Sequence, residues 1–365
     1  MCTMSNDRTS QLSRRALLGG GAAGLLAAPL GILGAQAFPS TRSPIDFSEF
    51  PLCRTSSETT PALTGAPRKL RLSWNANAVC LVTVPVAIDH GFFKKQNLDI
   101  ELVNFAGSTD QLLEAIATGK SDGGVGMALR WLKPLEQGFD VKITAATHGG
   151  CMRVLAPAKS GIASLNDLKG KTIGVADLGG ADKNFFSIEL AKRGIDPTNE
   201  VEWRVFPGNL LRLAAEKGET HAFLSGDPVA YLWLKDGTFR EVASNLDGEF
   251  KERSCCILGL RGSLVRDEPK VARAVTQAIL DAAMFTAQNP DLAARAFAPY
   301  ATKEATFDDL RALVGYHTHH HHPTGSVLKN ELKAYADDLK LVSVFKKTTD
   351  TTKFAERIYA DVLSI

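Results

Sequence analysis

The sequence has little net charge and, after its N-terminal leader, no long apolar run. Its 42 basic and 40 acidic side chains nearly cancel, which leaves a formal charge of +2. We see no basic stripe and no aromatic platform, so a nucleic-acid surface is not expected. No stretch after the leader approaches the roughly 20 apolar residues of a membrane span, so we expect a soluble mature chain. No serine or histidine lies in a recognisable nucleophile elbow, which argues against nucleophilic catalysis.

Cysteine is also scarce, with six residues in 365. Cys2 and Cys53 lie near the N-terminus and are not expected to take part in any site. No cysteine lies at the expected cleavage site, so no lipoprotein anchor is expected. The four that remain are far apart along the chain, except for one adjacent pair: Cys80, Cys151, Cys255 and Cys256.

The first 37 residues have the pattern of a removable export signal. The paired Arg14 and Arg15 precede a short apolar stretch, and residues 35–37 form an A-x-A cleavage motif. The arginine pair followed by two leucines resembles the twin-arginine signal, which directs export of folded proteins; an ordinary secretory signal is the alternative. Residues 38–68 are rich in Ser, Thr and Pro and predict an extended tether. We therefore expect a periplasmic protein of about 330 residues, enough for two domains.

From residue 69 the chain alternates between strand and helix patterns. Residues 70–74 and 98–105 alternate apolar and polar side chains as strands do, and residues 84–90 between them have helical spacing. The same alternation returns after residue 164. Strands that alternate with helices predict parallel β-α-β units and an α/β fold.

Four stretches carry a resemblance to a known family. PVAIDHGFFKKQNLDIELV, GSTDQLLEAIATGKSDGGVG, ASLNDLKGKTIGV and DEPKVARAVTQAILDA occur in this order between residues 69 and 300. They resemble the periplasmic substrate-binding proteins of ABC importers, in the nitrate, sulfonate and taurine branch. The resemblance implies a bilobal periplasmic-binding-protein fold of type II, with two α/β lobes, a hinge and a helical C-terminal segment. Lobe I would comprise residues 69–151 and 255–365, and lobe II residues 152–254.

The same resemblance implies how the protein works. It would be no enzyme, would need no cofactor to bind a solute, and would meet the inner membrane only through an ABC permease. Its ligand would lie in the cleft, at strand ends and helix N-termini, as open α/β sheets generally place ligands. For an oxoanion, helix N-termini and an arginine would supply the contacts. The ligand-binding candidates are Asn75, Asn77, Gly107, Ser108, Thr109, Arg130, Gly179, Gly180, Asp182 and Asp227.

Each of the four cysteines falls where the resemblance places the cleft or the hinge. Three interpretations stay open. Buried cysteines can act as small apolar side chains; an oxidising periplasm favours a disulfide, for example Cys80–Cys151; or four thiolates can bind a soft metal or an iron–sulfur cluster. Export of folded proteins favours the third, because a metal centre can be installed before export. Adjacent strand residues face opposite ways, so Cys255 and Cys256 both ligate only from a turn; otherwise His148 is the substitute ligand.

A second unusual feature is the run of histidines at 317 and 319–322, interrupted only by Thr318. Five imidazoles within six positions can capture zinc, nickel or copper. The alternative is a solvated helix end, and we expect loose capture at the surface rather than coordination in the cleft.

These patterns lead to one main hypothesis and two rivals. The main hypothesis is a substrate-binding protein whose cleft is lined by cysteines that hold a metal centre or an iron–sulfur cluster. The first rival is a plain binding protein for a small anion such as a sulfonate, nitrate or an aromatic acid. The second is an iron-dependent enzyme similar to the thiamine-pyrimidine synthases, which share this fold but carry a dense cysteine cluster that no single stretch here matches.

Overall fold

The computed structural model describes residues 62–105 and 109–365. The expected export signal at 1–37 therefore lies outside the described residues, and so does most of the expected tether. Gly107 and Ser108, two of the ligand-binding candidates, are outside as well. Within the part that is described, no helix combines the length and the apolar character that a membrane crossing requires.

One mixed sheet holds strands from both ends of the described chain. Its order is β2-β1-β3-β10-β4. The strands are β1 (Arg68–Trp74), β2 (Leu98–Asn104), β3 (Gly123–Met127), β4 (Val141–His148) and β10 (Cys256–Arg261). Strand β1 runs parallel to β2 and β3, whereas β10 is antiparallel to β3 and β4. Because β10 enters between β3 and β4, Cys256 lies beside Met127 on one neighbour and His148 on the other.

A second sheet has the same plan and is built from the intervening residues. Its order is β7-β6-β8-β5-β9. The strands are β5 (Met152–Pro157), β6 (Thr172–Val175), β7 (Glu202–Val205), β8 (Ala222–Gly226) and β9 (Phe239–Ser244). Here β6 runs parallel to β7 and β8, and β5 is antiparallel to β8 and β9. In both sheets a single antiparallel strand is inserted beside a parallel set.

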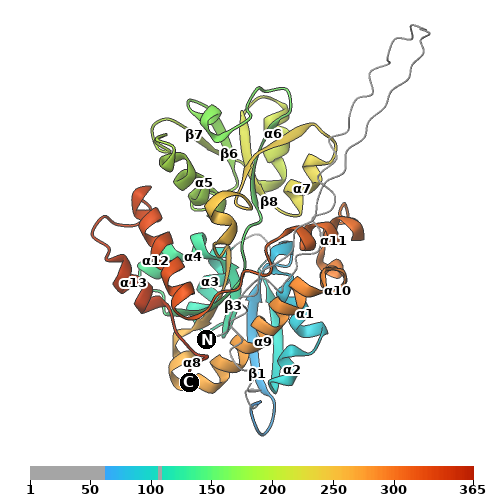
Figure 1. Cartoon of the computed structure of the whole chain (residues 1–365), viewed down its shortest axis with the longest axis vertical. Coiled ribbons are helices and arrows are strands. Elements are labelled where there is room, and N and C mark those ends of the chain that lie inside the picture. The colour runs from blue at the N-terminus through green and yellow to red at the C-terminus, as the bar shows by residue number, and fades with distance from the viewer. Residues whose placement is uncertain (1–61, 106–108) are drawn as a thin grey trace, which may run out of the picture. The chain divides into compact units, whose positions relative to one another are not determined.

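Helices accompany both sheets (Figure 1). Those of the first sheet are η1 (Val79–Leu81), α1 (Thr83–Asp89), α2 (Phe92–Lys95), α3 (Thr109–Ala117), α4 (Ala128–Glu136), α8 (Gly262–Asp267), α9 (Pro269–Gln288), α10 (Pro290–Phe297), η5 (Ala298–Tyr300), α11 (Phe307–Tyr316), α12 (Gly325–Leu341) and α13 (Thr351–Ile358). Those of the second are η2 (Leu165–Leu168), α5 (Ala181–Lys192), η3 (Gly208–Leu210), α6 (Leu211–Glu216), α7 (Val229–Leu234) and η4 (Gly248–Glu252). The long helix α9 contacts α1, α2 and β4.

The chain passes between the two sheets twice, and the two passages touch. The first crossover is residues 149–151 and the second is residues 245–255. The Asn245 side chain accepts hydrogen bonds from the backbone N–H groups of Cys151 and its successor, at 2.8 and 2.7 Å. A Cβ on Gly150 would lie 2.4 Å from the Asn245 carbonyl oxygen, so only glycine fits there. The two crossovers are therefore in direct contact at Gly150 and Asn245.

The predicted α/β fold with two sheets is confirmed. The helix expected at 84–90 is α1, and the strands expected at 70–74 and 98–105 are β1 and β2. Strand β1 begins at Arg68, one residue before the predicted start of lobe I, because the Arg68 backbone already pairs with Leu98 of β2.

Candidate functional site

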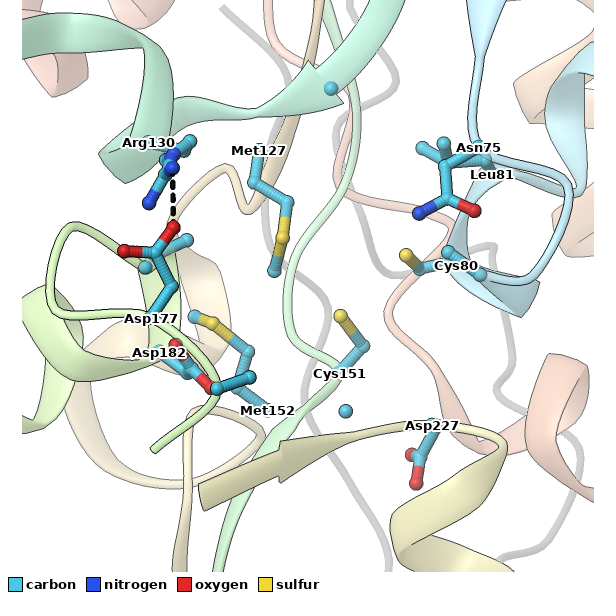
Figure 2. Close-up of a pocket in the computed structure, with 16 residues that line it drawn as sticks. Asn75, Cys80, Leu81, Met127, Arg130, Cys151, Met152, Asp177, Asp182 and Asp227 are labelled. Atoms are coloured by element: carbon cyan, nitrogen blue, oxygen red, sulfur yellow. Dashed lines mark ion pairs between the residues drawn. The ribbon is translucent and has the colours of Figure 1, made fainter. Parts of the chain in front are cut away.

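A cavity of about 330 Å³ lies between the two sheets at the crossovers. Figure 2 shows side chains from both sheets pointing into it. Its walls contain four sulfur-bearing side chains, one arginine and three aspartates. The lining residues are Asn75, Ala78, Cys80, Leu81, Gly126, Met127, Arg130, Cys151, Met152, Ala176, Asp177, Gly180, Ala181, Asp182, Gly226 and Asp227.

Of the four cysteines singled out in the sequence, Cys80 and Cys151 line this cavity, and each contacts one of the other two. Cys80 lies in η1, Cys151 ends the first crossover, Cys255 ends the second, and Cys256 begins β10. All four are buried free thiols. The Sγ atoms of Cys151 and Cys255 are 3.8 Å apart, and those of Cys80 and Cys256 are 3.9 Å apart. Residues separated by 104 and 176 positions in sequence are thus in sulfur–sulfur contact.

His148, the last residue of β4, joins both pairs of thiols. A ring nitrogen of His148 and the Sγ atoms of Cys80 and Cys256 all lie within 4.8 Å of one another. The same holds for His148 with Cys151 and Cys255. The imidazole was expected only as a substitute for a thiol that leaves the site. In the structure it lies with all four.

The backbone explains how the adjacent pair keeps both thiols in one place. Strand β10 begins at Cys256, so Cys255 still belongs to the irregular second crossover. The Cys255 N–H donates to the His148 carbonyl at 2.9 Å, and the Cys255 carbonyl accepts from the Ala128 N–H at 2.8 Å. These bonds hold Cys255 against the ends of β3 and β4, one residue before β10 begins, and its thiol contacts Cys151 while that of Cys256 contacts Cys80.

The contacts within the cluster lower the pKa of two of the thiols and raise the pKa of the other two. A hydrogen bond from Cys151 is the largest influence on both Cys80 and Cys255, and it holds the pKa of each well below its usual value. The hydrogen-bonding contacts with Cys255 and Cys80 raise the pKa of Cys151, and burial raises the pKa of Cys256. Burial opposes the charge on His148, but the neighbouring Cys80 raises its pKa. Two of the four side chains, Cys80 and Cys255, are thus favoured as thiolates, the form that binds metal.

The polar wall opposite the thiols is already paired within the chain. Arg130 forms an ion pair with Asp177 at 2.5 Å. The Gly179 N–H donates to the Asp177 carboxylate at 2.9 Å. The Lys183 N–H, at the start of α5, donates to the Asp182 carboxylate at 2.8 Å. The charge and donors expected to receive an oxoanion here are therefore directed at the protein's own carboxylates.

Asp227 is the buried anchor of a second network. Its carboxylate accepts from Arg153 Nη2 at 2.8 Å and lies 2.9 Å from His317 Nε2. Burial would raise the pKa of Asp227, but the hydrogen bond with His317 and the charge of Arg153 together keep it below the usual value. Arg153 also pairs with Glu241. A charged aspartate is therefore held beside the first crossover with both of its neighbours satisfied.

The predicted ligand residues divide between the cavity and its surroundings. Asn75, Arg130, Gly180, Asp182 and Asp227 line the cavity. Asn77 is exposed and donates its N–H to the Asn75 side chain, and Gly179 is exposed at the entrance to α5. Thr109 is the first residue of α3.

Sequence reasoning missed Met152 and Asp177, which line the cavity, and named Met127 only as the start of the stretch 127–130 that the resemblance places at the cleft. A signal was present for each of them. Met127 ends β3, Met152 follows Cys151, and Asp177 comes two residues after β6 ends at Val175. The rule that ligands gather beyond the carboxyl ends of strands would have found Met127 and Asp177.

The histidine run does not form a solvated helix end, as one interpretation held. Helix α11 ends at Tyr316, and the chain then turns so that His317 and His319 are buried, 4% and 1% exposed, while His320 is exposed. His321 lies 3.0 Å from Glu331 of α12. The expectation of loose surface capture is therefore wrong for His317 and His319, because the segment folds back against the first crossover.

Comparisons with known proteins agree on the fold. The alkanesulfonate-binding protein SsuA from Xanthomonas axonopodis pv. citri, bound to MOPS, matches with a TM-score of 0.66 and 19% identity over 81% of this chain and 100% of its own. The periplasmic nitrate-binding protein NrtA from Synechocystis PCC 6803 has a TM-score of 0.66 and 14% identity over 82% and 88%. A zinc-bound ligand-binding component of an ABC-type import system from Staphylococcus aureus has a TM-score of 0.66 and 14% identity over 81% and 98%.

These likenesses confirm the expected periplasmic-binding-protein fold. Among curated proteins, none matches this sequence. A family model does match: the model of the NMT1-like family covers residues 64–300, which is more than half of the chain. The chain therefore belongs to the NMT1-like family.

Proposed function

We propose that this protein is an exported solute-binding protein of an ABC importer, and that a metal centre ligated by Cys80, Cys151, Cys255 and Cys256 forms the floor of its cleft. The family and the fold support the first part of this proposal. The partner is then an ABC permease, and the cleft between the two sheets is the place for the transported ligand.

The spacing of the sulfur atoms carries the second part. Zinc–thiolate bonds of 2.3 Å in a tetrahedral site place neighbouring sulfurs about 3.8 Å apart. The sulfur atoms are 3.8 Å apart in the Cys151–Cys255 pair and 3.9 Å apart in the Cys80–Cys256 pair. Each pair lies within 4.8 Å of a ring nitrogen of His148, but the four sulfurs do not all lie within 4.8 Å of one another, so one ion bound by all four must draw the two pairs together. A disulfide would require about 2.0 Å. Packing of cysteines as small apolar side chains gives no reason for four thiols from separate segments to gather around one imidazole.

The surroundings of the thiols suit a soft metal. Thiolates and thioethers together favour Cu(I), zinc and iron–sulfur clusters. Besides the thiols of Cys80 and Cys151, the thioethers of Met127 and Met152 face the same cavity (Figure 2). A ligand in the cavity is thus able to touch the metal centre directly.

A plain anion receptor is the second candidate, and the charges of the cavity disfavour it. Arg130 is one cation against the three aspartates that line the same space, and it is already paired with Asp177. The backbone donors at Gly179 and Lys183 are directed at side-chain carboxylates of the chain itself. A free sulfonate or nitrate would have to displace these carboxylates before it gained the same contacts.

The test is metal analysis of the full chain purified without oxygen, together with acid-labile sulfide and X-ray absorption. We expect bound metal with sulfur scatterers near 2.3 Å. The double variant C255S/C256S should lose this sulfur-bound metal, while C53S, whose cysteine was not expected to take part in any site, should retain it. Acid-labile sulfide distinguishes an iron–sulfur cluster from a single ion. Protein that binds no metal through sulfur would refute the thiolate centre and leave the anion receptor, which nitrate or sulfonate binding would then support.

A further inference from the structure

Three buried imidazoles lie together next to the thiols. His148 comes from the end of β4, and His317 and His319 come from the segment that follows α11. The ring centroids of His148 and His319 are 5.3 Å apart, those of His317 and His319 are 5.8 Å apart, and those of His148 and His317 are 6.0 Å apart. All three side chains are at most 4% exposed.

The ring nitrogens of this group have an unusual lack of partners. Among the described residues, twelve buried side-chain nitrogen and oxygen atoms have no hydrogen-bond partner, and five of them belong to these three rings. They are both nitrogens of His148, both nitrogens of His319 and Nδ1 of His317. An unsatisfied buried polar group costs about 1–3 kcal/mol, so such a concentration requires an explanation, of which a bound ion is one.

The environment of His317 favours the metal-binding form of its ring. Its Nε2 lies 2.9 Å from the buried carboxylate of Asp227, which Arg153 also contacts. A charged carboxylate accepts a hydrogen bond, so Nε2 carries the proton and Nδ1 keeps a free lone pair. Histidines that bind metals are typically oriented in this way by a carboxylate on the opposite ring nitrogen.

His319 is suited to the same role for a different reason. Its side chain is 1% exposed, and neither of its ring nitrogens has a hydrogen-bond partner. No contact within the protein therefore occupies the nitrogen that would bind an ion. A neutral imidazole is a good ligand for zinc, copper and nickel.

We propose that His148, His317 and His319 form a second metal site, adjacent to the thiolate centre and occupied by a zinc-like divalent ion. Three imidazoles on one tetrahedral ion, with metal–nitrogen bonds of 2.0–2.1 Å, have ring centroids about 5 Å apart. The observed separations of 5.3 to 6.0 Å are slightly wider, and the rings of His148 and His317 are stacked at an angle of 14°. The rings must therefore turn as well as approach before one nitrogen of each reaches a common ion. Four thiols are enough for one four-coordinate ion, which leaves His148 available to the imidazoles.

The experiment is a zinc titration of the metal-free full chain under reducing, anaerobic conditions, with bound zinc counted and free thiols assayed. We expect two zinc ions per chain. The variant His319→Leu keeps an apolar side chain of similar size but no donor nitrogen. The variant should bind one zinc ion, and its thiols should still be protected from alkylation. Its affinity for the second ion should fall at least 100-fold, because 100-fold is about the most that is lost when a residue that merely orients a metal ligand is removed. His320→Leu, in the same run but exposed, is the matched control and should bind two.

This experiment can refute the histidine site and the thiolate centre independently of each other. In C255S/C256S the histidine site should still bind one zinc, with nitrogen scatterers only. The metal-free His319→Leu protein should melt no lower than the wild type, since the change removes two unpaired nitrogens. The proposal is overturned if the wild type binds one zinc and His319→Leu leaves that ion unaffected. It is also overturned if His319→Leu exposes the thiols, because His319 would then belong to a single mixed site.

Discussion

Mild oxidation of the metal-free protein should join Cys151 to Cys255 and Cys80 to Cys256. The sulfur atoms of these pairs are 3.8 and 3.9 Å apart. A disulfide needs about 2.0 Å, so each pair must close by roughly 1.8 Å, a distance that rotation of the two side chains can cover. The first bridge links residues 104 positions apart. Closing a loop of about 100 residues stabilises a folded chain by about 4.7 kcal/mol through the entropy of the unfolded state.

The assay uses the full chain with Cys2→Ser and Cys53→Ser, so that only the four clustered thiols remain. After treatment with diamide, alkylation and peptide mapping identify the bridges, and urea unfolding before and after oxidation measures the stability gained. Protein loaded with zinc beforehand should resist oxidation because the thiolates are ligated. Bridges that join Cys80 to Cys151, or the absence of any bridge, would refute the arrangement of the cluster described here.

Further predictions concern the ion pairs and the crossovers. Replacing Asp227 by Asn removes the fully buried charge partner of Arg153 and leaves it only the partly exposed Glu241, so it should lower the free energy of unfolding by about 3–5 kcal/mol in a urea titration; a loss under 1 kcal/mol would contradict its role as an anchor. Gly150→Ala should destabilise by more than 1 kcal/mol because the new Cβ meets backbone, and an unchanged melting temperature would show that the crossovers can separate. The pair of Arg68 and Glu268 is partly exposed, so E268Q should cost under about 1 kcal/mol. The hydrogen bond from Arg68 lowers the pKa of Glu268, so the stabilisation by this ion pair is present above a pH of about 4.3 and is lost as the pH falls below that value. The urea midpoints of the wild type and E268Q, compared at pH 7 and at pH 3, would check this loss.

Much of the fold could be predicted, because the pattern of apolar residues records which face of each element is buried. The strands β1 and β2 and the helix α1 between them follow from their spacing alone. The insertion of β10 into the first sheet could not be obtained in this way. It depends on contacts with β3 and β4, from which it is separated by more than 100 residues, and only the family resemblance indicated it.

The clustering of the thiols could be predicted because the family resemblance places each of the four cysteines at the cleft or at a crossover, although they are far apart in the sequence. What could not be predicted is how Cys255 and Cys256 share one site. That depends on a difference of one residue in where β10 begins, and the hydrogen bonds of Cys255 to His148 and Ala128 decide it.

The anion-binding contacts expected at Gly179 and Gly180 could not be judged from the sequence, because they depend on which acceptors the backbone N–H groups meet. Glycines before a helix indicate free N–H groups, but sequence does not show which acceptor they meet. Here the Asp177 carboxylate accepts from the Gly179 N–H, and the Asp182 carboxylate accepts from the Lys183 N–H. The burial of His319 was equally hidden, because the direction in which the chain leaves α11 is set by tertiary packing.

The contact between the two crossovers has a thermodynamic consequence. Cys151 belongs to one crossover and Cys255 to the other, so any rotation of the sheets that bends these segments also changes the distance between two ligand atoms. Binding free energies are reciprocal: if closing the lobes brings the sulfurs to the spacing that a metal prefers, then the metal stabilises closure by the same amount. A permease that pulls the lobes apart would work directly against the coordination bonds, and the strength of those bonds would set how firmly the protein holds its cargo until docking.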